Sequence, residues 1–251
     1  MTILSLMSVV VLALSAVGLV LPLVSTLDLS SQTLSVVGRA LAGSGVVLGI
    51  ALLGGVPAGV LVGIGAVEVG GVTGRIARTA SDVLAAVPPI VLGFVVYAIV
   101  VLTLHAGSIT AGAVALGCLI APAVARATLE LLQRVAPSLR DAATALGGSR
   151  ARVVVLVMLR SVAPDLVRAV VRTTARAIGE AAPLLFVTAA VVSSGDVADA
   201  SRVMALPAAV FSLASAPGID GGARTHTFAM VLALVVATLG LIGRRRAEQP
   251  R

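Results

Sequence analysis

Four charged side chains recur at every fourth position within one otherwise apolar stretch, at Arg168, Arg172, Arg176 and Glu180. On a helix, this spacing places them along a single, slowly turning stripe. A charged side chain at the centre of a bilayer costs about 2.5–3.5 kcal/mol on insertion scales, so such a stripe must face protein or water. Guanidinium groups also donate paired hydrogen bonds to tetrahedral oxyanions. The stripe therefore predicts either the lining of an anion path or a buried Arg176–Glu180 pair that holds helices in register.

The same stretch contains a predicted helix break. Pro183 lacks the amide that would bond to the carbonyl of Gly179, so the helix is expected to kink or open between these two residues. Transporters often place substrate sites at interrupted helices near the middle of the membrane. We therefore expect Gly179 and Pro183 to mark the path. Arg160 and Asp165 are expected near the cytoplasmic interface, and Arg168 and Arg172 are expected to lie deeper than these two.

The elements that must position these side chains are strongly hydrophobic. Of 251 residues, 59% are hydrophobic and 12% are charged, and the mean hydropathy is +1.13. This composition excludes a soluble domain and is typical of a membrane protein with several spans. All 18 basic residues are arginine, and we attribute the net charge to the positive-inside rule rather than to nucleic-acid binding. The single Cys118 predicts neither a disulfide nor a metal site.

Six apolar blocks predict an all-α integral membrane fold with six helices. They cover residues 3–24, 41–66, 83–104, 108–125, 161–192 and 226–243. Twelve arginines fall in the connectors 67–82 and 126–160 and in the tail 244–251, which predicts that both termini are cytoplasmic. The first block is expected to be a retained span and not a cleaved signal peptide, because it is long and no basic residue precedes it. Residues 1–251 are expected to form one transmembrane domain.

Glycines and prolines predict how these helices pack and end. Gly45-x3-Gly49 and the series Gly55, Gly59 and Gly63 have the four-residue spacing of close helix contacts in membranes. Prolines at 57, 88–89 and 122 are expected to kink or bound their helices. A short apolar piece at 204–214, inside the long connector 193–225, suits the membrane interface.

The connector 126–160 is predicted to be a short helix, a glycine turn and a second helix. Ser138 is expected to cap the first helix, with Asp141 three residues later as a weak capping box. A small apolar face follows, made of Leu139, Ala142, Ala143 and Leu146. It suits insertion into the groove of a partner protein, or packing on its own bundle. Glu68 and Asp82, beside the connector 67–82, are expected at the membrane interface.

Two of these motifs resemble a known family. The pattern Asp141-Ala-Ala-x3-Gly147 resembles the EAA loop of ABC importer permeases, with Asp in place of Glu. The run Arg176-Ala-Ile-Gly-Glu-Ala-Ala-Pro-Leu-Leu-Phe186 resembles the signature of PstA-type permeases, which are the membrane subunits of phosphate uptake systems. Segments 54–68, 87–93 and 206–217 agree, so the resemblance covers most of the chain from about residue 40 onward.

The resemblance implies an ABC importer permease in the bacterial cell membrane. It would pair with a homologous second permease, a cytoplasmic ABC ATPase dimer and an extracytoplasmic phosphate-binding protein, and it would pass inorganic phosphate. Asp141, Ala142, Ala143 and Gly147 would be the ATPase-coupling element. The chain has no lysine, hence no G-x4-G-K-[ST] phosphate loop. We therefore expect no enzymatic activity, cofactor or metal in this chain, and ATP bound by the partner.

Two alternatives remain open. The substrate could be another oxyanion, such as sulfate, molybdate or phosphonate. The chain could also be a divergent, non-transporting subunit, because family members usually carry uncharged residues at 168 and 172, and arginine there either widens the anion-attracting stripe or blocks it. An intramembrane enzyme finds little support, since His105 and His226 are isolated at the ends of spans.

Overall fold

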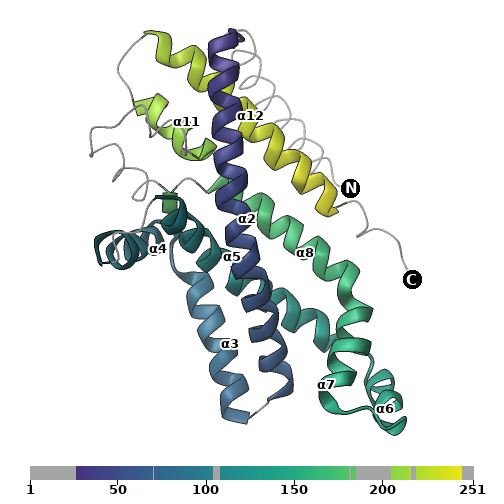
Figure 1. Ribbon diagram of the computed structural model, residues 1–251. Helices are drawn as coiled ribbons and strands as arrows, with labels where there is room; N and C mark the ends of the chain where they lie inside the picture. Colours follow the sequence, from purple (N-terminus) through teal and green to yellow (C-terminus); the bar gives the residue numbers. More distant parts are fainter. Residues whose placement is uncertain are drawn as a thin grey trace, which may run out of the picture.

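The computed structural model describes residues 27–69, 71–103, 108–180, 182–184, 205–215 and 219–244, and the regular secondary structure in these ranges is entirely helical. The predicted span 3–24 lies outside them. In chain order, the elements are α2 (Ser31–Glu68), α3 (Gly71–Ala86), α4 (Pro89–Val96), the π-helical η1 (Tyr97–Thr103), α5 (Ser108–Gln133), α6 (Pro137–Ala145), α7 (Arg150–Arg152), the π-helical η2 (Val153–Met158), α8 (Leu159–Gly179), α11 (Leu206–Ser215) and α12 (Ile219–Arg244). Figure 1 shows their arrangement.

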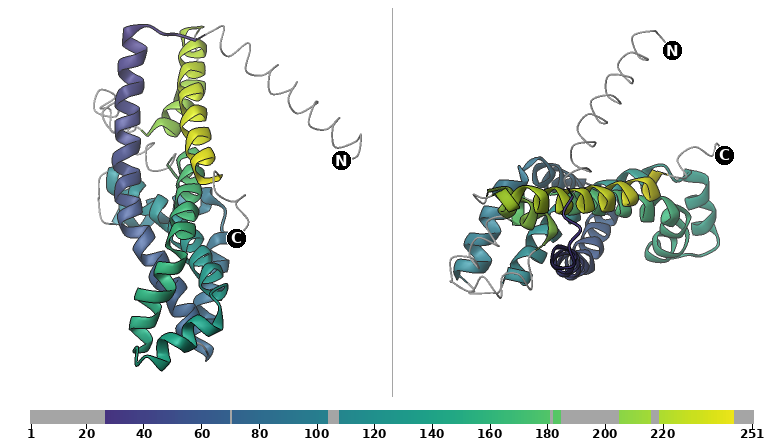
Figure 2. Two further views of the ribbon diagram at one scale, coloured as in Figure 1. Left: turned by 90° about the vertical axis from the view of Figure 1, so that its right-hand side faces the viewer. Right: turned by 90° about the horizontal axis from the view of Figure 1, so that it is seen from above.

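Helix α2 is the long rod of the bundle (Figure 2). It begins after Ser30, whose hydroxyl accepts a hydrogen bond from the backbone N–H of Thr33 at 3.3 Å and thereby satisfies one free amide of the first turn. Its 38 residues span about 57 Å, nearly twice the hydrocarbon thickness of a bilayer. The helix contains the predicted span 41–66 and begins ten residues before it.

Helix α2 packs against α5 at backbone contact distance. A methyl group at Gly59 would lie 2.5 Å from the carbonyl oxygen of Ala121, and one at Gly63 would lie 2.6 Å from Cβ of Thr128. Only glycine fits there, because any larger side chain would force the helices apart. Gly55 continues the same seam, so the second glycine series of the sequence is the interface between these two helices.

The first glycine series behaves differently. Methyl groups at Gly45 and Gly49 would meet no other atom within 4 Å. These two glycines therefore form no helix contact among the described residues, and the four-residue spacing alone did not distinguish them from Gly55 and Gly59.

The predicted span 83–104 is not one straight helix. The chain bends by 100° between Gly71–Ala86 and Pro89–Leu102, with Pro88 as the N-cap and Pro89 in the first turn of α4. Proline supplies no backbone N–H and disfavours the helical conformation of the residue before it, so α3 cannot continue through this pair. The expectation that these prolines bound a helix is confirmed, and residues 83–104 do not form one continuous helix.

Three described helices are long and apolar enough to cross a membrane. They are Ser31–Glu68, Ile109–Gln133 and Gly222–Gly243, and the bent pair α3–α4 makes a fourth if it counts as one span. Helix α8 fails this test because of its many charges, and it ends at Gly179 rather than continuing through the predicted block 161–192. Helix α5 extends beyond the predicted end at residue 125 as far as Gln133, with Pro122 inside it.

The connector folds as a short helix, a glycine turn and a second helix. Pro137 occupies the first position of α6, and its N-cap is Ala136, which makes no side-chain bond; the predicted cap by Ser138 is wrong, because the proline fixes the start one residue earlier. Gly147 has φ +82°, a conformation that favours glycine. Ser149 then precedes α7, which runs without interruption through η2 into α8.

Helix α11 packs against α2 and α12. Leu206 and Ala209 are buried with Val37 and Ala40 of α2 and Phe228 of α12. The backbone N–H of Leu206 donates to Oγ of Ser44 at 2.7 Å. The apolar piece 204–214 is thus part of a small core that joins α2 to α12.

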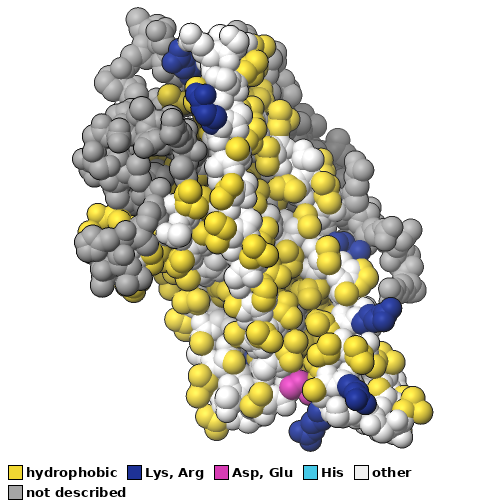
Figure 3. Space-filling view, viewed as in Figure 1, with side chains coloured by type: hydrophobic (Ala, Val, Ile, Leu, Met, Phe, Trp, Pro, Cys, Tyr) yellow, Lys and Arg dark blue, Asp and Glu magenta, His cyan; other side chains and the backbone are white. Residues whose placement is uncertain are grey.

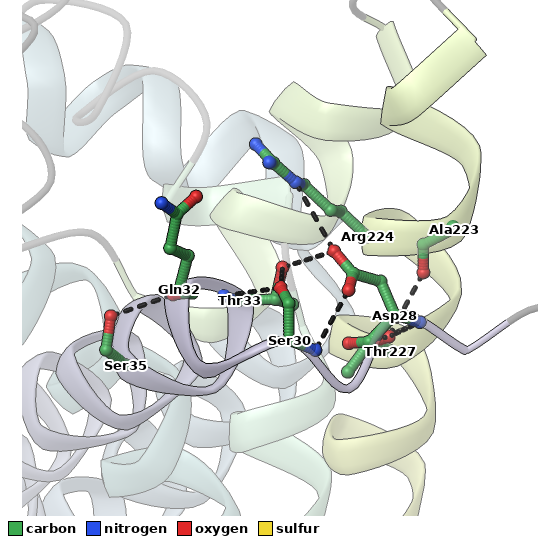
Figure 4. A network of polar contacts seen from close by, with 8 residues as sticks. All are labelled: Asp28, Ser30, Gln32, Thr33, Ser35, Ala223, Arg224 and Thr227. Atoms are coloured by element: carbon green, nitrogen blue, oxygen red, sulfur yellow. Dashed lines mark hydrogen bonds and ion pairs between the residues drawn. The ribbon is translucent and has the colours of Figure 1, made fainter.

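A polar clasp joins the start of α2 to α12 (Figure 4). The carboxylate of Asp28 accepts bonds from the hydroxyl of Thr33 at 2.5 Å and from the backbone N–H of Ser30 at 3.0 Å. The backbone N–H of Asp28 donates to Oγ1 of Thr227 at 2.9 Å, and Nε of Arg224 lies 3.6 Å from Oδ2 of Asp28. Hydrogen bonds from Thr33 and Ser30, with a smaller contribution from Arg224, lower the pKa of Asp28 to about 2.

We predict that Gly59→Ala lowers the stability of the purified protein. The added methyl group would lie 2.5 Å from a backbone oxygen, and overpacking of this kind costs about 1–3 kcal/mol. The measurement is the thermal unfolding midpoint in detergent. Gly54→Ala is the matched control, because it adds the same methyl group to the same helix where no atom lies within 4 Å. Equal midpoints for the two variants would contradict the close α2–α5 contact.

We also predict that the clasp weakens in acid. The pKa of Asp28 is lower in the folded chain than its ordinary value of 3.8. The stabilisation by the carboxylate is therefore complete above pH 4 and disappears as the pH falls through about 2. The unfolding midpoint of Asp28→Asn should lie below that of the wild type at pH 6, and the two should converge toward pH 2. A difference that does not change with pH would mean that the carboxylate charge is not what holds the clasp.

Candidate functional site

The charged stripe of α8 divides into two parts with different surroundings. Arg168 pairs with Asp165 one turn earlier on the same helix. Arg176 lies with Nε 3.8 Å from Oε1 of Glu180; its side chain is 82% exposed, whereas that of Glu180 is 30% exposed. Arg176 therefore points away from its own bundle, and Glu180 lies closer to the interior.

Arg172 lies against the end of α12. A methyl group at Gly243 would lie 2.6 Å from Cγ of Arg172 and 3.7 Å from the carbonyl oxygen of Arg168. Seven residues further along α8, a methyl group at Gly179 would lie 3.8 Å from Cγ2 of Val236. The two helices thus run antiparallel, so each of these residues of α8 lies level with an identified residue of α12.

The break after α8 lies level with the middle part of α12. Arg224 and Arg244 lie 20 residues apart on α12, a rise of about 30 Å, which equals the hydrocarbon thickness. Val236 is about 12 Å from the Arg244 end and about 18 Å from the Arg224 end. Gly179, which is level with Val236, therefore lies near the middle of α12, whereas Arg172 lies level with its Arg244 end.

The interruption after α8 brings together two separate motifs. The helix ends at Gly179, and Glu180 is extended, with φ −84° and ψ 98°. Pro183 is fully buried, and a methyl group at Gly93 of α4 would lie 2.5 Å from Cα of Pro183 and 2.7 Å from its carbonyl oxygen. Gly93 closes the segment 87–93 noted in the sequence, so that segment and the Gly179–Pro183 break form one contact.

Next to the break lies a small cavity of about 10 Å³, which has room for about one water molecule. Its lining is almost entirely apolar and includes Ala177, Ile178 and Leu184. Its one hydroxyl, that of Ser44, is already bonded to the backbone of α11. An oxyanion does not fit in this space.

Helix α6 projects from one end of the molecule (Figure 1). None of its residues is buried, and Asp141 and Ala142 are exposed. Of its apolar face, only Ala143 packs inward, against the cluster that contains Val153. Leu146, which directly follows the last residue of α6, is 90% exposed.

Apolar side chains cover most of the face of the molecule seen in Figure 3. The basic side chains on this face lie at its upper end and along its lower right-hand side, where α6–α8 lie.

Sequence reasoning missed one contact at this end. Nη2 of Arg140 on α6 lies 2.6 Å from Oε2 of Glu68, the last residue of α2. The side chain of Glu68 is only 15% exposed. The sequence predicts a position at the membrane interface for Glu68. It contains no signal that pairs Glu68 with Arg140, which lies 72 positions further along the chain.

The stripe, the break and α6 thus occupy three places. Arg176 and Glu180 lie beside the break, Arg168 and Arg172 lie toward the end of α12, and Asp141, Ala142, Ala143 and Gly147 lie on the projecting α6 and its turn. Among the described residues, no group of three or more His, Cys, Asp or Glu side chains could hold a metal ion.

Comparisons with known proteins agree on one family. Residues 55–245 match the family described as "Binding-protein-dependent transport system inner membrane component". The chain is 32% identical over 209 residues to the phosphate transport system permease protein PstA of Yersinia pestis, covering 82% of this chain and 70% of that protein. It is 33% identical over 207 residues to the phosphate transport system permease protein PstA 1 of Mycobacterium tuberculosis, covering 81% of this chain and 67% of that protein.

A solved structure shares the fold. The structure of the methionine ABC transporter MetNI in inward-facing conformations contains a chain that matches with a TM-score of 0.58 and 18% sequence identity, covering 86% of this chain and 97% of that chain. At this identity, the likeness concerns the fold alone.

We predict that Gly93→Ala destabilises the protein. The methyl group would overlap the backbone of Pro183 at 2.5 Å, and backbone cannot move aside as a side chain can, so we expect a cost of about 1–3 kcal/mol. Gly112→Ala is the matched control, because its nearest atoms are the side-chain methyl groups of Leu184 and Val47 at 3.3 and 3.4 Å. Thermal unfolding in detergent distinguishes the two variants. If the unfolding midpoint of Gly93→Ala is not lower than that of Gly112→Ala, the break does not contact α4 as described.

Proposed function

The chain belongs to the family of inner membrane components of binding-protein-dependent transport systems, and we propose that it is the permease subunit of an ATP-driven phosphate importer. The observation that carries this proposal is the 32–33% identity to phosphate permeases named PstA over four-fifths of the chain. The shared fold alone does not select a substrate, since the similar solved chain comes from a methionine transporter.

We propose that Arg176 and Glu180 line the path at the break after Gly179. The position of Gly179 level with the middle of α12 supports this placement, because interrupted helices near the middle of the membrane are common substrate sites. Arg176 is largely exposed on its own bundle, and an arginine facing lipid there would cost about 2.5–3.5 kcal/mol. A second permease subunit that supplies the opposite wall would remove this cost.

Arg168 and Arg172 have a different role in this proposal. Arg168 pairs with Asp165, and Arg172 packs against Gly243 at the end of α12. Near the membrane surface, long arginine side chains reach water at little cost. Neither arginine approaches the break, which argues against a path blocked by these two residues.

The topology we propose has six membrane helices in a single domain, with both termini in the cytoplasm. The six are the predicted span 3–24, α2, the bent α3–α4 pair, α5, α8 and α12. The α6 end of the bundle is then cytoplasmic, because most of the arginines lie in the connectors and the tail at that end.

The exposed α6 would dock into a cytoplasmic ABC ATPase dimer through Asp141, Ala142 and the turn at Gly147. A short helix with small, exposed side chains suits a groove in a partner. An extracytoplasmic phosphate-binding protein would deliver phosphate at the Asp28 end. Opening a path at the break would then require that a movement of α6 is transmitted to the membrane helices.

The test is uptake of radiolabelled phosphate in cells that lack their own phosphate permease. The chain is co-expressed with its second permease, ATPase and binding protein. We expect Arg176→Ala to reduce uptake at least about tenfold, equivalent to ~1.4 kcal/mol, while Arg168→Ala retains most of it. Excess sulfate should not compete.

Three results would count against these proposals. Competition by sulfate or another oxyanion would point to a permease of different specificity. A stable, ATPase-bound complex without uptake would point to a non-transporting subunit. Equal losses in Arg176→Ala and Arg168→Ala would contradict the division of the stripe.

A further inference from the structure

We infer that the Glu68–Arg140 ion pair is the connection through which α6 and α2 move together. The inference rests on the proposed role of α6 as the ATPase-coupling element. Nη2 of Arg140 and Oε2 of Glu68 are 2.6 Å apart, with the two side chains 39% and 15% exposed. Among the ion pairs of the described residues, this one alone joins α6 to a helix that crosses the membrane.

Helix α6 has few other attachments. No residue of α6 is buried, and its inward packing consists mainly of Ala143 against Val153 and its neighbours. Leu139 is 41% exposed. Small apolar contacts of this kind tolerate sliding, so the charged and directional Glu68–Arg140 contact fixes where α6 lies relative to α2.

The end of α2 that receives this contact is held firmly. Arg78 donates two hydrogen bonds, from Nε at 3.2 Å and from Nη2 at 2.9 Å, to the carbonyl oxygen of Ala66. Gly63 contacts Thr128 of α5 with no space for a methyl group. A displacement of Glu68 would therefore move α2 together with α3 and α5, rather than fray its last turn.

The opposite end of α2 carries the clasp of Asp28 with Thr227 and Arg224 on α12. One uninterrupted helix thus connects a polar contact with α6 at one end to a polar contact with α12 at the other. Because α12 runs beside the break at Gly179, a shift of α6 has a continuous, packed route to the proposed path.

The two partners of the pair are not equivalent. Oε1 of Glu68 is buried without a hydrogen-bond partner, so loss of Arg140 would leave a shielded carboxylate with no partner for either oxygen. Arg140 is more exposed and can turn to water when Glu68 is lost. Removal of Arg140 should therefore disturb α6 more than neutralisation of Glu68 does.

The experiment compares phosphate transported per ATP hydrolysed in proteoliposomes that contain the complete importer. We expect Glu68→Gln to reduce this ratio on the order of tenfold, and Arg140→Gln to reduce it further. ATPase copurification should remain unchanged, since the exposed face of α6 is intact. The reversed pair, Glu68→Arg with Arg140→Glu, should recover part of the ratio, which a general loss of stability would not allow.

The matched control is the pair of Arg126 with Asp82, which joins α5 to α3 at 3.5 Å and does not involve α6. Both of its side chains are more than half exposed, and exposed pairs contribute little. Arg126→Gln should therefore leave the ratio close to that of the wild type.

A second measurement needs no partner protein. Trypsin cleaves after arginine, so cleavage after Arg140, relative to cleavage after Arg150, reports opening of α6 in the isolated permease in nanodiscs. We expect Glu68→Gln to raise this relative rate several-fold, and Asp82→Asn to leave it unchanged.

The outcomes separate the two proposals. If the wild-type importer transports phosphate and neither Glu68→Gln nor Arg140→Gln changes the ratio, the inference is overturned and the proposed function stands. If the wild-type importer transports nothing, the proposed function fails, and the trypsin measurement still decides whether the pair positions α6. An unchanged relative cleavage rate in Glu68→Gln would show that the ion pair does not position α6.

Discussion

The bundle depends on the backbone contact between α2 and α5. At Gly55, Gly59 and Gly63 the two helices approach so closely that methyl groups would overlap atoms of α5. Within a membrane, apolar side chains gain little by leaving lipid for protein, so close packing of small residues must supply the attraction. This seam makes α2 a fixed reference. Additional polar bonds at its two ends place α3 and α12, and the bond from the backbone N–H of Leu206 to Ser44 places α11.

Charged side chains are distributed along the bundle according to the free energy of placing a charge at each position. The Asp28–Arg224 clasp lies at one end of the membrane helices, and the Glu68–Arg140 pair lies at the other. Arg176 and Glu180 lie at the interruption after α8, and a charge within a membrane requires protein or water nearby. The apolar cavity beside them is too small for an ion, and the largely exposed Arg176 side chain lies outside the packed core.

Several features were predictable because local chemistry decides them. Pro88 and Pro89 cannot continue a helix, Gly147 adopts a positive φ, and Pro183 cannot donate to Gly179; the chain bends, turns and ends its helix at these places. Local reasoning did not distinguish Gly45 and Gly49, which meet no neighbour among the described residues, from Gly55 and Gly59, and it did not pair Glu68 with Arg140. In both cases the answer depends on which neighbour lies opposite, and a single sequence does not contain that information.

The sequence by itself determined a hydrophobic, all-helical membrane protein, a family resemblance and the residue types at the break and on α6, because these follow from composition, periodicity and the stereochemistry of proline and glycine. Only the tertiary structure decided that Gly93 contacts Pro183, that Arg172 lies beside Gly243, and that Glu68 pairs with Arg140. These contacts join residues far apart in the chain, and their distances are set by how closely whole helices pack, which no local pattern encodes.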